Sequence, residues 1–252
     1  MMAVLVAALA LVWSGAGFSV AISMDSRLLS PSPRHPLGTD DLGRDLLCAV
    51  TFGTGISLLV GIVVVAVSAV LGTLVGLMAG LTGGWLEGTV MRCVDVVLAF
   101  PGILLAVALA AFLDPGLAGL VGLLVFCGWA GYARLVRGEV LRYRRAEFIL
   151  AARSYNAPWS RILLHHLPPM ILPLVWVQAS LGLGEVILAE SGLNFLGLGL
   201  DPVIPTLGQI LAAGLGHLMD RPLMMIVPGC VLVWLVVASI FLADGLSDRG
   251  GT

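Results

Sequence analysis

The sequence predicts an all-α integral membrane protein with six transmembrane helices. Of its 252 residues, 59% are hydrophobic and only 11% are charged, whereas a soluble domain carries about 25% charged residues. Such a composition cannot cover a water-facing surface, so the bilayer must be part of the solvent. Six apolar segments are each long enough to cross as a helix, and they are residues 1–21, 55–81, 94–113, 117–133, 171–190 and 223–243. Residues 1–21 lack the basic start of a signal peptide, so we expect a retained first helix.

Glycine and proline refine two of these spans. Gly72, Gly76 and Gly80 recur at four-residue spacing in the second span. A stripe of small residues at this spacing lets two helices approach closely, so we expect a packing role for it. Pro101 lies inside the third span, and a proline at such a position is expected to kink the helix.

The arginines predict the topology. Residues 134–170, called the basic segment below, carry seven of the 13 arginines and only two acidic residues, Glu139 and Glu147. The positive-inside rule therefore predicts that the basic segment is cytoplasmic. Alternation of the spans then puts nine arginines inside and four outside. The predicted topology has both termini in the cytoplasm, and residues 82–93 form a short cytoplasmic loop.

The basic segment has the pattern of two short amphipathic helices. Glu139–Tyr155 has a helical apolar face, Asn156 suits a left-handed helix end, and Pro158 suits the start of a second helix. Ile162 and Leu163 belong to the apolar stripe of that second helix. Physics alone leaves two interpretations open: an amphipathic element lying on anionic lipid, or a docking element for a soluble protein.

Four motifs resemble those of a known family. Glu147, Ala151, Ala152, Asn156, Ile162 and Leu172-Pro173 are similar to the EAA loop of ABC-transporter permeases, although Asn156 stands where the family has glycine. Three further stretches resemble the oligopeptide/dipeptide/nickel branch: residues 35–45 (HPLGTDDLGRD), 92–102 (RCVDVVLAFPG) and 195–199 (FLGLG).

The resemblance implies a fold, a set of partners and a location. The expected fold is that of a type I ABC importer (MetI-like) permease, one domain over residues 1–252, in a bacterial inner membrane. The expected partners are a second homologous permease, two cytoplasmic ATPase subunits that bind ATP and Mg, and an extracytoplasmic substrate-binding protein. No cofactor is expected in this chain. The resemblance also implies that Glu147, Ala151, Ala152, Asn156, Ile162 and Leu163 contact the ATPases.

Two polar residues in the fifth span are candidates for the substrate path. Gln178 and Glu185 are seven residues apart, so they share a helix face. An ionisable residue at membrane depth costs about 2.5–3.5 kcal/mol on insertion scales and is a functional candidate by default. The alternative is a carboxyl that is paired with a polar group of a partner or kept protonated.

Charged residues near the ends of the spans have simpler interpretations. We expect Glu190 to lie near the outer membrane surface, where it could face water at little cost. Arg92 and Asp95, three residues apart, are expected to form an exposed ion pair. Two interpretations are open for the cluster of Asp40, Asp41, Arg44 and Asp45, which are a solvated cap on the second span and a contact with a binding protein.

The sequence argues against an enzyme. It contains no phosphate-binding loop of the P-loop type, no Ser/His/Asp arrangement, and no cluster of its four cysteines that would hold a metal. The predicted function is a permease subunit of an ATP-driven importer for peptides, nickel or metal chelates. The alternative is a channel or secondary carrier, not driven by ATP, whose basic segment touches lipid.

Overall fold

In the computed structural model, all named elements of the described residues are helices, and one isolated bridge joins Thr39 and Asp45. The described residues are 22–112, 116–144, 146, 147, 149, 154 and 167–250. Four helices there are long and apolar enough to cross a membrane, or up to five if a bent pair counts as one. The long helices are α2 (Leu46–Thr82), α5 (Leu117–Tyr143), α8 (Pro168–Phe195) and α10 (Leu223–Gly250). The short ones are η1 (Met24–Ser26), α3 (Gly84–Leu98), α4 (Gly102–Ala110) and α9 (Leu207–Leu215).

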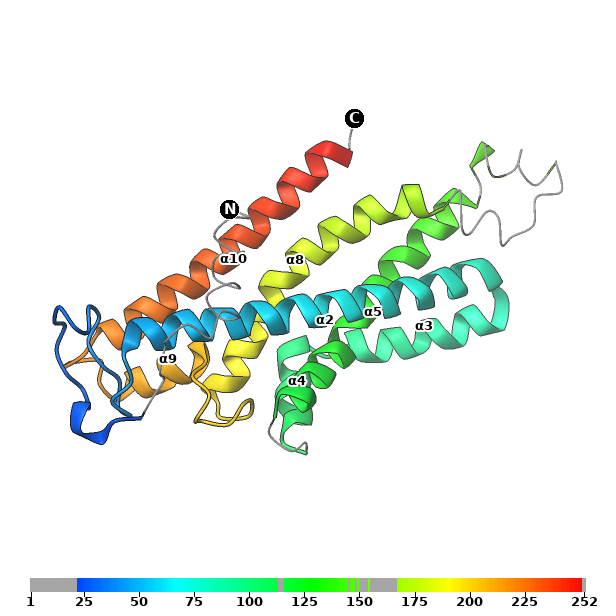
Figure 1. Ribbon diagram of the computed structural model, residues 1–252. Coiled ribbons are helices and arrows are strands. Elements are labelled where there is room, and N and C mark those ends of the chain that lie inside the picture. Colours follow the sequence, from blue (N-terminus) through cyan, green and yellow to red (C-terminus); the bar gives the residue numbers. More distant parts are fainter. Residues whose placement is uncertain are drawn as a thin grey trace.

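The helices form an elongated bundle with two distinct ends (Figure 1). Helix α2 packs against α5 and α8, and α10 packs against α8. The loop end holds the α2–α3 turn, the last turn of α5 and the first turn of α8, at the right of Figure 1. The cap end, at the left, holds residues 22–45, which we call the cap, together with α9. Helix α8 therefore connects the two ends.

The glycine stripe of α2 lies against α5, as predicted from its spacing. A Cβ on Gly76 would come within 2.6 Å of the Ala133 carbonyl oxygen, and one on Gly80 within 2.7 Å of the Val140 Cβ. A Cβ on Gly72 would likewise be too close to the Trp129 carbonyl oxygen. The absence of side chains at these three positions lets the two backbones touch.

The third predicted span is bent at its proline, as expected. Helices α3 and α4 meet at an angle of 82° across residues 99–101, where Pro101 precedes the first residue of α4. The start of this span differs from the prediction, because α3 begins at Gly84 rather than residue 94. Gly83 and Gly84 both have positive φ, 67° and 64°. These glycines reverse the chain within two residues, so residues 84–93 are helical and not a loop.

The other helices extend past their predicted spans. Helix α5 begins at Leu117 as predicted but continues to Tyr143, ten residues beyond residue 133. The helix expected over Glu139–Tyr155 is interrupted at residues 144 and 146, whereas Glu147, Ile149 and Ser154 are again helical. Helix α8 extends beyond the predicted span 171–190 at both ends, and α10 extends beyond residue 243 of the predicted span 223–243. Residues 1–21 lie outside the described residues, so the count of six spans stays a prediction.

Candidate functional site

Two residues of the basic segment are buried in the core of the bundle. Ile149 is fully buried, and so is Leu167, just before α8. Both belong to one apolar cluster with Val136 and Val140 of α5 and Ile171 of α8. Burying side chains of this size contributes about 1.5–3 kcal/mol each. The chain is therefore fixed to α5 and α8 at Ile149 and at Leu167.

Arginines of α5 join the loop end together. Arg137 donates two hydrogen bonds to Glu87 Oε1 on α3, at 2.5 and 2.8 Å. Arg144, which follows the last residue of α5, donates to the carbonyl of Gly80 at 2.8 Å. That carbonyl belongs to the last turn of α2, where helix carbonyls lack partners and a cation is favourable. These hydrogen bonds thus connect α5 to α3 and to α2 at the loop end.

One expected ion pair of this region has a different partner. Asp95 pairs with Arg134 of α5 at 2.6 Å, not with Arg92 of its own helix. Both side chains are more than half exposed, so the pair contributes little stability. The sequence spacing allowed the local pair, but the close packing of α3 against α5 brings Arg134 to Asp95 instead.

Most of the predicted coupling residues cannot be placed. Glu147 is exposed beside the anchor Ile149. The other five, Ala151, Ala152, Asn156, Ile162 and Leu163, lie outside the described residues. Their role therefore rests on the sequence motif and on the anchoring of the segment around them.

Gln178 and Glu185 lie on the side of α8 that meets α5. Gly182 lies between them on the same face, and a Cβ there would come within 2.9 Å of the Tyr132 hydroxyl oxygen. Glu185 is exposed and Gln178 is half-buried. The Tyr132 hydroxyl is buried and has no hydrogen-bond partner among the described residues. The two predicted path residues thus lie on the helix face that contacts the Tyr132 hydroxyl of α5.

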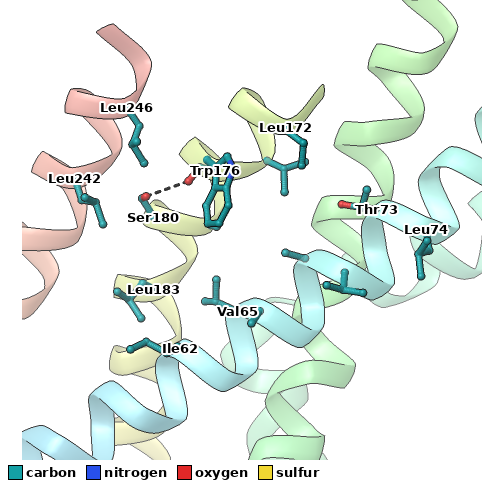
Figure 2. A pocket seen from close by; sticks show the side chains of 15 residues that line it. Ile62, Val65, Thr73, Leu74, Leu172, Trp176, Ser180, Leu183, Leu242 and Leu246 are labelled. Atoms are coloured by element: carbon teal, nitrogen blue, oxygen red, sulfur yellow. Dashed lines mark hydrogen bonds between the residues drawn. The ribbon is translucent and has the colours of Figure 1, made fainter. Parts of the chain in front are cut away.

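A large groove lies on another side of α8 and is apolar. It has a volume of about 680 Å³ and is bordered by α2, α8 and α10. Figure 2 shows Ile62, Leu183 and Leu242 reaching it from the three helices. Of its lining residues only Thr73 and Ser180 are polar, and the Ser180 hydroxyl donates to the Trp176 carbonyl at 3.0 Å. This groove suits hydrocarbon, and neither Gln178 nor Glu185 lines it.

Glu190 is fully buried, contrary to the expectation that it faces water. Its carboxyl accepts hydrogen bonds from Ser57 of α2 at 2.7 Å, from Ser191 at 3.2 Å and from Asn194 at 2.6 Å. The spacing of Glu190 and Asn194, four residues apart, was visible in the sequence. Ser57 is 133 residues away, and nothing in the local pattern pointed to it.

The cap is also less exposed than its charges suggested. Asp40 and Arg44 are 1% and 4% exposed and pair at 2.6 Å. Asp45 accepts from the Cys48 amide as the N-cap of α2, and His35 Nδ1 lies 2.8 Å from its Oδ2. Burial raises the pKa of Asp45, but the hydrogen bonds from His35 and Cys48 outweigh burial, so the pKa lies below its ordinary value. The solvated cap is therefore corrected to a folded cap with buried charges.

Long apolar helices and a bent helix pair define a multi-pass membrane protein. Comparison with known proteins agrees. The family model of the "binding-protein-dependent transport system inner membrane component" matches residues 72–250. The chain belongs to this family, whose members are inner-membrane transport components rather than enzymes.

Individual relatives and a solved structure extend this result. The chain is 37% identical to the dipeptide transport system permease protein DppC of Alkalihalophilus pseudofirmus, over 88% of this chain and 73% of that protein. It is 38% identical to the glutathione transport system permease protein GsiD of Pectobacterium atrosepticum, over 86% and 72%. Its fold matches a chain of the inward-facing MetNI methionine ABC transporter, with a TM-score of 0.68 and 22% identity over 81% of this chain and 97% of that one. The predicted all-α, MetI-like permease fold is confirmed.

Proposed function

We propose that this permease forms half of the translocation path of an ATP-driven importer for short peptides. A second homologous permease supplies the other half, two cytoplasmic ATPase subunits bind ATP and Mg, and an extracytoplasmic binding protein delivers the substrate. Peptides are favoured over nickel or metal chelates because relatives at 36–38% identity are named for transport of dipeptides, glutathione and D,D-dipeptides. The whole chain is proposed to act as one permease domain.

The basic segment is proposed to couple ATP hydrolysis to transport. The single observation that carries this role is its anchoring, since Ile149 and Leu167 lie in one buried cluster shared by α5 and α8. Glu147, Ala151, Ala152, Asn156, Ile162 and Leu163 are proposed to sit against the ATPase subunits. A segment that only binds lipid does not require such anchoring to two helices, so the anchoring favours the coupling role over lipid binding. The excess of arginine in this segment supports a cytoplasmic position for the loop end and for both termini.

Co-purification and reconstitution test this function. Affinity-tagged chain should recover a second permease and two ATPases, and the reconstituted complex should hydrolyse ATP faster when its binding protein carries a dipeptide. Recovery of a stable homo-oligomer without any ATPase would favour a channel or carrier and contradict the proposal.

Gln178 and Glu185 are proposed to line the path, where Glu185 would meet the ammonium group of a peptide. Replacing Glu185 with Gln keeps its size and removes its charge. We expect dipeptide uptake at limiting substrate to fall by about five- to tenfold, the effect of about 1–1.4 kcal/mol of lost interaction. Unchanged uptake at limiting substrate would remove Glu185 from the path.

A further inference from the structure

Glu190 links α8 to α2 inside the cap end of the bundle. Its Oε2 accepts hydrogen bonds from the hydroxyls of Ser57 on α2 and of Ser191, at 2.7 and 3.2 Å. Its Oε1 accepts from Asn194 Nδ2 at 2.6 Å. The carboxyl has 0% exposure, and a buried group whose hydrogen bonds are all made holds its neighbours in one arrangement.

Asn194 carries the connection onward from α8. Its Oδ1 accepts from the backbone N–H of Leu200 at 2.8 Å. The carbonyl of Leu200 in turn accepts from Gln209 Nε2 on α9 at 2.7 Å. A continuous series of hydrogen bonds therefore runs from α2 through Glu190 and Asn194 to the loop at residues 196–206 and to α9.

Close backbone contacts seat α9 on the same two helices. A Cβ on Gly208 would collide with the Ser191 carbonyl oxygen of α8. A Cβ on Gly53 of α2 would lie 3.0 Å from the Leu207 amide nitrogen. Tight contact of this kind leaves α9 little room to shift without α8, whereas the loop at residues 196–206 depends on its hydrogen bonds.

We propose that Glu190 is a positioning residue that makes the loop at residues 196–206 move with α8 during each transport cycle. Helix α8 begins at Pro168, within the last residues of the basic segment, and its 28 residues span about 42 Å to the cap end. A displacement at the loop end thus reaches the cap end, where Glu190 and Asn194 transfer it to the loop. The inference rests on the proposed function, because it needs the basic segment to be moved by an ATPase.

The donor and acceptor pattern offers a polarity-reversal test. Asn194→Asp keeps the oxygen that accepts from Leu200 but removes the amide nitrogen that donates to the Glu190 carboxyl and to the Glu190 backbone carbonyl. Adding Glu190→Gln restores the bond between the two side chains, because the introduced amide donates to the introduced carboxylate while its oxygen still accepts from Ser57. The bond to the backbone carbonyl stays absent in both variants. The matched control is Ser180→Ala on α8, whose hydroxyl bonds only to its own helix.

Movement of the loop is read at Val203, which is 63% exposed. The complex is prepared with Cys93 and Cys230, the exposed cysteines of the described residues, replaced by Ser and with Val203→Cys added. Maleimide labelling of that position is measured without nucleotide and with ATP. Uptake of a radiolabelled alanine dipeptide and ATP hydrolysis are measured on the same proteoliposomes.

Asn194→Asp should keep ATP hydrolysis within about twofold but lower dipeptide uptake per ATP by about tenfold, within the range of typical coupling between sites. Labelling should no longer differ between the nucleotide states. The double variant should recover both properties, and Ser180→Ala should not change them. Recovery in the double variant is the result that a merely destabilising substitution would not give.

The proposal is overturned if Asn194→Asp keeps full uptake per ATP and nucleotide-dependent labelling, or if the double variant is no better than the single one. A milder variant, Gln209→Met, removes only the last bond of the series and guards against misfolding. It should reduce the nucleotide-dependent difference in labelling, and an unchanged difference also counts against the proposal. Failure of the unmutated chain to assemble with ATPases is a separate result, and it contradicts the proposed function itself.

Discussion

Substitution of Gly76 by Ala tests whether the contact between α2 and α5 holds the bundle together. The new Cβ would lie 2.6 Å from the Ala133 carbonyl oxygen and 2.9 Å from the Val136 Cβ, whereas ordinary contact begins at 3.4 Å. The two backbones must therefore separate by about 3.4 − 2.6 = 0.8 Å. A gap of about 0.5–1 Å forfeits a quarter to a half of the dispersion energy of each contact.

Two opposing terms set the magnitude. Overpacking against rigid backbone costs about 1–3 kcal/mol. Ala in place of Gly within a helix stabilises by about 1 kcal/mol. We therefore expect Gly76→Ala to lower the free energy of unfolding by about 1 kcal/mol. Gly138→Ala on α5 is the matched control, because a Cβ there meets nothing within 4 Å, and it should be neutral or stabilising by up to about 1 kcal/mol.

The assay is reversible unfolding of the purified chain in mixed micelles by increasing fractions of SDS, followed by far-ultraviolet circular dichroism. The two variants should differ by about 1–2 kcal/mol in their free energy of unfolding. If Gly76→Ala is as stable as Gly138→Ala, the helices separate at no cost, and the role of the glycine stripe in packing is wrong.

Three further predictions concern the two ends of the bundle. Folding lowers the pKa of Asp45, so its carboxylate contributes stability above its unfolded pKa of about 3.9, and this contribution is lost as pH falls through the folded pKa. Thermal melting between pH 7 and pH 3 should show the loss of stability. The Asp45→Asn variant should not show that loss. Arg137→Met should lower the free energy of unfolding by about 1 kcal/mol, because it leaves the mostly buried Glu87 carboxylate unpaired. The same SDS titration measures this change, and an unfolding curve equal to that of the wild type would contradict it. Ala152→Arg should abolish ATP-coupled uptake by blocking contact with the ATPase while Asn156→Gly preserves it, and coupled uptake that survives Ala152→Arg would refute the coupling role.

The features predicted correctly from sequence are those with a local physical cause. The spacing of Gly72, Gly76 and Gly80 defines one face of a helix without reference to any partner. Pro101 lacks a backbone donor wherever it occurs, so the bend between α3 and α4 follows from that residue alone. Hydropathy located the centres of the described long helices for the same reason, because burial in hydrocarbon depends on composition over a window of residues.

The features that were mispredicted depend on partners distant in sequence. Glu190 is buried because Ser57, on a helix far away in the chain, supplies a donor to it. Asp95 pairs with Arg134 because α3 lies along α5. The arginines of α5 beyond residue 133 pair with Glu87 and Asp95 on α3, so charge did not mark the end of the helix. No single-chain pattern contains these pairings.

Helix α8 unites these observations, because each of its ends is fixed in a different way. At the loop end it is held by apolar burial, with Leu167 and Ile171 in the cluster that also contains Ile149. Such contacts are non-directional, so they tolerate small rotations of the basic segment. At the cap end it is held by directional hydrogen bonds of Glu190 and Asn194, which fix one geometry. With an adaptable apolar contact at one end and specific hydrogen bonds at the other, α8 is suited to the proposed transmission of a movement of the basic segment to the loop at residues 196–206.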